Sequence, residues 1–277
     1  MPIRGSLLLA ALLLASCDSK IETNTDQALL EKIDTVVDCF PGLYTKVDGL
    51  LELADSWRMN TSGSIADPAG LSYSIGGSGE IVASFTGFED AGCTLAMTIR
   101  FYDPSGVEQN LNLTSASTLA DKIDLAATTL RNASPTGNPF VVGTWTLSGT
   151  KGGDAISGSG SLTGIIGAAT GGNELEELRT TIATPAGGPP AVAASTITEA
   201  TCSLAFTTSS LVTDSTPTQS NPIGTIDITI TRNPGPNQIV VDASVTFDGS
   251  STIQVRIDGT SGRFDYDVAT KTLTQRP

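Results

Sequence analysis

The residue type that enzymes use most often for proton transfer is absent from this chain. Its 277 residues include no histidine, which excludes a Ser-His-Asp triad, a Cys-His pair and any zinc site with a histidine ligand. Ser148 and Lys151 have the Ser-x-x-Lys spacing in which a lysine activates a serine. That chemistry needs a helix start to hold both groups, whereas this pair lies in a glycine-rich segment typical of a β turn. The sequence therefore predicts a protein that is not an enzyme and needs no cofactor.

Three aspartates form a weak candidate for a metal site. Asp265 and Asp267 are two residues apart in a segment with β-strand alternation, so their side chains project to the same side. Asp258 lies across the adjoining hairpin, and calcium accepts such oxygen donors without fixed geometry. The favoured interpretation is different: these residues belong to the solvated face of an antiparallel sheet in an acidic protein, and no metal is bound.

Three of the four cysteines, Cys39, Cys93 and Cys202, are widely separated. Outside the cytoplasm, three thiols allow one disulfide and leave one free. We expect the bridge to join Cys93 to Cys202, because an internal repeat described below places them at equivalent positions. The alternatives are a bridge from Cys39 to either of the other two, and no bridge at all.

The fourth cysteine ends a segment of a different kind. Arg4 is followed by an apolar run over residues 7–14 and then by Leu14-Ala15-Ser16-Cys17. A run this short is typical of a secretory signal and too short for a permanent membrane span. Its end closely resembles the lipobox of bacterial lipoproteins; an ordinary secretory signal with a chance cysteine is the alternative. The resemblance implies that residues 1–16 are a signal peptide, that Cys17 is lipidated, and that the acyl chains hold the protein to a membrane of the bacterial envelope, outside the cytoplasm.

The charge of the chain limits its partners. The formal net charge is −14 at pH 7, so phosphate backbones and anionic lipids repel it. Nucleic acid is therefore excluded as a partner, and membrane contact is expected through the acyl chains alone. A protein partner or a hydrophobic ligand remains compatible with this composition.

The hydrophobic pattern predicts a helical segment near the start of the chain. Residues 17–24 form a short polar tether, and over residues 25–58 apolar residues recur at intervals of three and four. Pro41 interrupts this segment. We expect two short helices with a kink or a tight helical pair, packed on a sheet.

The C-terminal hundred residues alternate between apolar and polar in four consecutive runs. This pattern predicts antiparallel strands with one buried and one solvated face. Asp248-Gly249 and Asp258-Gly259 lie between runs, where tight hairpins need positive φ. The expected buried positions are Ile228, Val245, Val255 and Tyr266, and the expected solvated positions are Asp227, Asp242, Asp265 and Asp267.

A weak internal repeat extends the β prediction upstream. Residues 91–98 resemble 200–207, and residues 138–145 resemble 221–226. We therefore expect a β domain over residues 71–277, with two similar halves at 71–170 and 175–277; chance similarity is the alternative. An amphipathic helix over Thr118–Arg131 would be an insertion in the first half.

Together these patterns predict a mainly β protein: an antiparallel β-sandwich or half-open barrel with an N-terminal helical segment and one inserted helix. The function predicted is a non-enzymatic binding or structural role in the envelope. The alternative is a carrier that holds a hydrophobic small molecule or lipid between the sheet and its helices. The two differ in their interiors, because a carrier needs an unfilled apolar cavity of roughly 300–1,000 Å³.

Overall fold

The computed structural model describes residues 22–55, 67, 69–134, 139–165, 175–179, 195–214, 223–233 and 236–276. The predicted signal peptide (1–16), Cys17 and the first residues of the tether lie outside these ranges.

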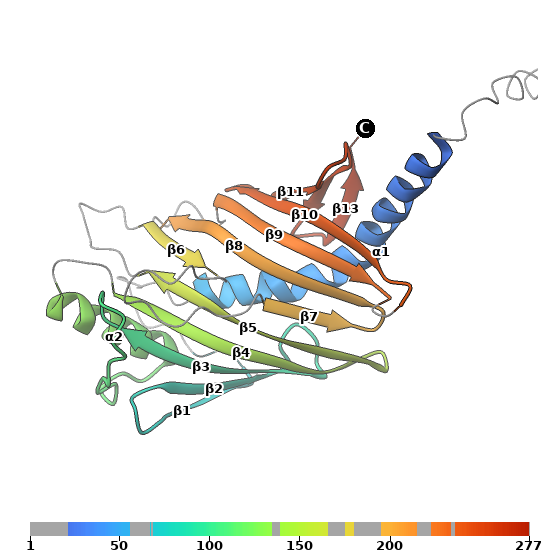
Figure 1. Ribbon diagram of the computed structural model, residues 1–277. Helices are drawn as coiled ribbons and strands as arrows, with labels where there is room; N and C mark the ends of the chain where they lie inside the picture. Colours follow the sequence, from blue (N-terminus) through green and yellow to red (C-terminus); the bar gives the residue numbers. More distant parts are fainter. Residues whose placement is uncertain are drawn as a thin grey trace, which may run out of the picture.

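The N-terminal helical segment is one helix, α1 (Glu22–Asp55), with Pro41 inside it. The predicted separation into two helices is wrong, although Figure 1 shows the two halves of α1 running in different directions. A proline removes one hydrogen bond and crowds the carbonyl four residues earlier, which bends a helix without necessarily ending it. Buried contacts on both sides of the bend, at Cys39 and Phe40 and then at Leu43 and Tyr44, hold the two halves on the sheet.

The described strands form a single antiparallel sheet of thirteen strands. Neighbours in the sheet follow chain order, except that β6 and β7 both lie between β5 and β8, one at each end. The strands are β1 (Leu71–Ile75), β2 (Ile81–Thr86), β3 (Cys93–Tyr102), β4 (Phe140–Lys151), β5 (Asp154–Ile165), β6 (Leu175–Arg179), β7 (Ser195–Glu199), β8 (Cys202–Asp214), β9 (Ile223–Arg232), β10 (Ile239–Asp248), β11 (Thr252–Ile257), β12 (Arg263–Asp267) and β13 (Thr272–Gln275).

The sheet curves around α1 and stays open between β1 and β13 (Figure 1). The mainly β fold is therefore confirmed, and of the two predicted architectures the single open sheet corresponds to the half-open barrel. The second helix, α2 (Leu119–Ala133), is inserted between β3 and β4, close to the predicted range. Thr118 caps it by accepting a hydrogen bond from the Asp121 backbone N–H at 3.1 Å.

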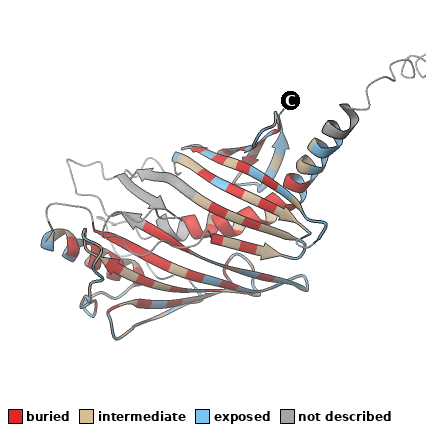
Figure 2. Cartoon of the chain, in the orientation of Figure 1, coloured by how far each residue is buried: buried red, intermediate tan, exposed pale blue. Residues whose placement is uncertain are grey.

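Burial alternates along the strands, as Figure 2 shows. Val255 pairs in register with Val245 and Phe264, and all three are at most 1% exposed. The four predicted buried positions are all buried. Asp227 and Asp242 are exposed, and Asp265 and Asp267 are partly exposed. The predicted faces of the C-terminal strands are confirmed.

The helix α1 fills the concave side of the sheet. Phe40 and Tyr44 are fully buried, and their rings lie 5.4 and 5.3 Å from the ring of Tyr266 on β12. Val36, Val47 and Leu50 extend this contact along the helix, each with no exposed surface. Burying side chains of this size contributes about 1.5–3 kcal/mol each, so the helix and the sheet share one core.

The two segments of the internal repeat occupy similar places in the sheet. Cys93 begins β3 and Cys202 begins β8, while the second pair of matched segments leads into β4 and β9. The sheet continues without a break from β5 through β7 to β8. The division into halves at 71–170 and 175–277 stays a prediction.

Candidate functional site

A buried lysine joins three distant segments at one end of the sheet. Lys46, on α1, is 1% exposed, and its Nζ lies 3.0 Å from Glu199 Oε2 and 3.1 Å from Asp90 Oδ2. The same ammonium donates to the Gly42 backbone carbonyl at 3.1 Å. Asp90 lies in the turn before β3, and Glu199 is the last residue of β7. The ammonium therefore connects the helix to two separate turns of the sheet.

A second lysine approaches the same carboxylates from the solvent side. Lys151 Nζ, at the end of β4, lies 3.7 Å from Asp90 Oδ1 and 3.8 Å from Glu199 Oε1. These four residues, the Lys46 cluster, balance two positive charges against two negative ones. The Ser148–Lys151 pair lies on a β-strand, without the helix start that serine activation requires, and its lysine faces the two carboxylates.

The protonation of Lys46 limits what chemistry it can do. Burial lowers the pKa of Lys46, but hydrogen bonds to Glu199 and Asp90, with the charges of both, outweigh it, so the pKa is raised above its ordinary value. An amine must lose its proton before it can act as a base or nucleophile. Lys46 therefore acts as a fixed positive charge that holds α1 to the sheet.

A disulfide makes a second connection at the same end of the molecule. Cys39 on α1 is joined to Cys202 at the start of β8, with their Cα atoms 5.6 Å apart. Cys202 is paired in register with Glu199, and Cys39 precedes Lys46 by two helical turns. The covalent and ionic connections between helix and sheet are thus close together.

The predicted Cys93–Cys202 bridge is wrong, and the alternative from Cys39 is confirmed. In the sheet, β4, β5 and β7 separate β3 from β8, which places the two strands about 19 Å apart at the usual strand spacing. A disulfide needs Cα atoms within about 7 Å. Of the three cysteines that the structure describes, Cys93 is the free one, and it is buried. Burial raises the pKa of its thiol, as does the charge of Asp90, so it is poorly suited to act as a thiolate nucleophile.

The calcium candidate is not assembled. Asp265 accepts a hydrogen bond from Arg276 Nε at 2.7 Å, and Asp267 accepts one from the Thr270 backbone N–H at 2.8 Å. Asp258 lies in the turn after β11, at the opposite end of the hairpin from Asp267. Within the described ranges, no group of three or more Asp, Glu, Cys or His residues could hold a metal ion. The strand alternation correctly placed Asp265 and Asp267 on one face. It did not indicate the residues that donate hydrogen bonds to them.

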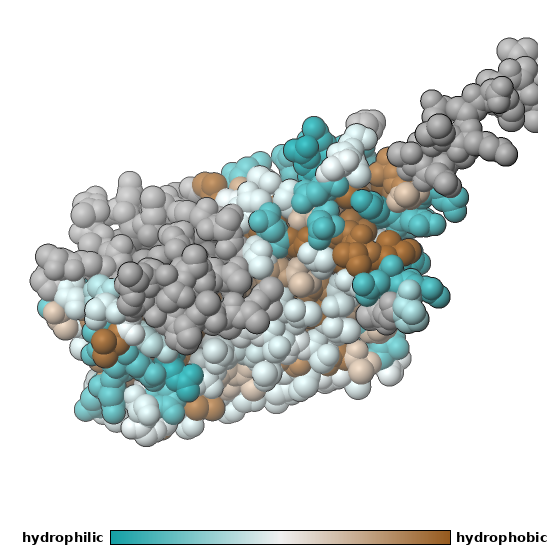
Figure 3. All heavy atoms as spheres, viewed as in Figure 1, coloured by the Kyte–Doolittle hydropathy of each residue, from teal (hydrophilic) through white to brown (hydrophobic). Residues whose placement is uncertain are grey.

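The outer face of the sheet carries an extended array of hydroxyl groups, which sequence reasoning missed. One row of register partners crosses seven neighbouring strands, from β2 to β9 without β6, and contains only serine and threonine. Its members are all exposed or half-buried, and this part of the surface is pale in Figure 3, neither strongly hydrophilic nor hydrophobic. We call it the hydroxyl face; the row consists of Thr86, Thr94, Ser148, Ser157, Thr198, Ser203 and Thr231.

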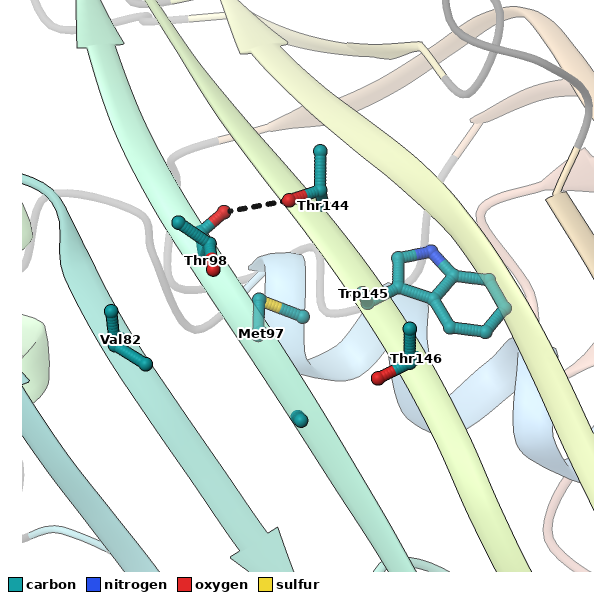
Figure 4. Close-up of a pocket in the computed structure, with 7 residues that line it drawn as sticks. Val82, Met97, Thr98, Thr144, Trp145 and Thr146 are labelled. Atoms are coloured by element: carbon teal, nitrogen blue, oxygen red, sulfur yellow. Dashed lines mark hydrogen bonds between the residues drawn. The ribbon is translucent and has the colours of Figure 1, made fainter.

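A shallow hollow lies on the same outer side of the sheet, next to the hydroxyl face on β2, β3 and β4 (Figure 4). It has a volume of about 170 Å³ and is lined in part by Val82, Ala96, Thr98, Thr144 and Thr146. The Thr144 hydroxyl donates to the Thr98 backbone carbonyl at 3.4 Å, which leaves its oxygen free to accept. The hollow is smaller than the roughly 300–1,000 Å³ of a typical small-molecule site. Its shape suits contact with a surface better than enclosure of a ligand.

Comparisons with protein-family models, with curated proteins and with solved structures found no match. Neither α1 nor α2, over their described residues, is both long and apolar enough to cross a membrane.

Proposed function

We propose that this protein is a lipid-anchored protein of the bacterial envelope, outside the cytoplasm, with a non-enzymatic binding or structural role. The lipobox-like segment Leu14–Cys17 supports the anchor. The helix α1 begins at Glu22, so the connection from Cys17 spans at most about 18 Å. Such a short connection would keep the folded body close to the membrane surface.

The interior of the sheet carries the argument for a structural role over a carrier. A hydrophobic ligand would have to lie between the curved sheet and α1, where Phe40 and Tyr44 already contact Tyr266. Opening that space would require α1 to leave the sheet, which both the Cys39–Cys202 disulfide and the Lys46 cluster oppose. Because α1 is held against the sheet and occupies the space that a ligand would need, these contacts support a scaffold with a filled interior.

The chemistry of the reactive side chains supports a non-enzymatic role. Lys46 is held in its protonated form, and Cys93 is buried as a neutral thiol. The hydroxyl face offers a broad surface whose groups can exchange hydrogen bonds with a partner without the cost of desolvating charges. We expect a partner of the envelope to be contacted there.

The anchor is tested by Cys17→Ala in the full-length chain, produced in a bacterial host that processes lipoproteins. The wild type should fractionate with membranes and have the mass of a lipidated chain that begins at Cys17. The variant should be released or remain unprocessed, and Cys93→Ala is the matched control that should behave as the wild type. An unlipidated wild type would contradict the proposal.

The scaffold role is tested by native mass spectrometry of the protein after gentle extraction. A filled interior predicts the mass of the lipidated chain alone. A lipid or other apolar molecule retained at one per chain would favour the carrier instead.

A further inference from the structure

Three arginines gather on the outer face of the last strands, although the chain is strongly acidic. Arg256 on β11, Arg263 on β12 and Arg276 just after β13 line one hollow of about 300 Å³. The whole chain has a net charge of −14, so three arginines around one hollow are unexpected in a chain with this excess of acidic residues. The polar side chains that complete the lining are Ser244, Thr246 and Gln254.

Two of these arginines face each other directly. Arg256 and Arg263 are register partners across β11 and β12, and both are exposed. Among the described residues, neither guanidinium has a hydrogen-bond or ion-pair partner. Like charges at directly opposed positions destabilise a sheet, so this pair weakens the fold unless something binds between the two groups.

The third arginine is held beside this pair. Arg276 Nε donates to Asp265 Oδ2 at 2.7 Å, and the Arg276 backbone N–H donates to the Arg263 carbonyl at 2.9 Å. In the part of the chain that the structure describes, Asp265 pairs with Arg276 alone, so the charges of the other two arginines are not balanced by it and the local balance is positive. The hollow therefore combines positive charge, neutral hydrogen-bond donors and enough volume for a small anionic group.

We propose that this hollow binds a phosphate-type oxyanion between Arg256 and Arg263. Each guanidinium is a planar fork that can donate two parallel hydrogen bonds to phosphate oxygens. The hydroxyls of Ser244 and Thr246 lie on the neighbouring strand and supply further donors. A bound anion would also remove the repulsion between the two arginines, so binding and folding support each other.

The phosphate could be free or part of a phospholipid headgroup. Figure 1 shows β11–β13 at the end of the molecule where α1 projects beyond the sheet. If Cys17 carries the anchor, this end faces the membrane; the assignment to a headgroup rests on the proposed function, whereas oxyanion binding does not.

The test begins with isothermal titration of the purified full-length chain with inorganic phosphate at constant ionic strength. Arg256→Gln and Arg263→Gln should each weaken phosphate binding at least tenfold. Arg100→Gln is the matched control, because Arg100 lies in the same sheet on β3 and is paired with Glu108 at 3.3 Å; it should bind as the wild type does. Absence of phosphate binding by the wild type, or equal loss in the control, would overturn the proposal.

Thermal unfolding supplies a second readout. Without phosphate, Arg256→Gln should unfold at a higher temperature than the wild type, because it removes the repulsion with Arg263. Phosphate should raise the unfolding temperature of the wild type and leave that of the variant unchanged. A variant that is less stable in both conditions would mean that Arg256 has a structural role instead.

The source of the phosphate is resolved by titrating water-soluble dihexanoyl phosphatidate below its micelle concentration, with dihexanoyl phosphatidylcholine as the comparison. Binding of the phosphatidate at least tenfold tighter than inorganic phosphate supports a headgroup, and equal affinity supports free phosphate. The result of these titrations does not affect whether the wild type fractionates with membranes. The anchor and the oxyanion site are therefore tested separately.

Discussion

Removing the Cys39–Cys202 bridge should cost more stability than any other substitution of a cysteine in this protein. The bridge joins residues 163 positions apart, so the unfolded chain is closed into a very large loop. The chain-entropy treatment assigns about 5 kcal/mol to a loop of this length at 25 °C, with measured values often lower. Because a domain is typically stable by only about 5–15 kcal/mol, the effect should be large.

The double variant Cys39→Ala/Cys202→Ala is the direct perturbation. The Lys46 cluster still holds α1, so the circular dichroism spectrum should remain that of the wild type. Its unfolding temperature should fall by about 10–20 °C, from about 2–4 °C per kcal/mol in chains of comparable size. The urea dependence should become steeper, because the unfolded chain is no longer compacted by the loop.

Reductant provides the control within each protein. A reducing agent should lower the stability of the wild type to that of the double variant and should leave the double variant unchanged. Cys93→Ala should keep the full response to reductant and lose only about 1 kcal/mol, from the buried atom removed. The reasoning is refuted if reductant does not affect the wild type, or if Cys93→Ala abolishes the response.

The remaining predictions concern the strand faces and the Lys46 cluster. Val255→Asp should cost at least about 4 kcal/mol, because it leaves an unpaired charge at a position that is 1% exposed; Thr246→Asp on the exposed face should change stability by less than about 1 kcal/mol in urea unfolding, and similar costs would contradict the assigned faces. Lys46→Met should cost about 3 kcal/mol by the same measurement, since it removes the buried partner of two carboxylates, whereas Lys151→Met on the solvent side should cost less than about 1 kcal/mol; the reverse order would mean that the outer lysine holds the helix. Because the pKa of Lys46 is raised by folding, its stabilisation is complete below its unfolded pKa of about 10.4. The stability difference between wild type and Lys46→Met should therefore stay constant from about pH 7 to about pH 10 and narrow as the pH rises further; a difference that already narrows between about pH 7 and pH 9 would refute the assignment.

Local patterns in the sequence were sufficient for much of the fold. Alternation at period two placed Val255 and Tyr266 inside and Asp242 outside, because successive side chains of a strand point to opposite faces. Periodicity of three and four located α1 and α2 for the corresponding reason in a helix. The absence of histidine limited the chemistry without any structure. These properties depend on neighbours within a few positions, and the sequence contains them directly.

The connections between distant segments were decided only by the tertiary structure. Cys202 pairs with Cys39 because α1 crosses the sheet at β8, while three strands separate β8 from Cys93. In the sequence, Lys46 lies within the helical segment that is rich in apolar residues. Its partners Asp90 and Glu199 are brought to it by two turns far along the chain. Arg256 and Arg263 face each other only in the observed register. Such contacts depend on the order of strands and the path of the helix, which residue type and local spacing do not specify.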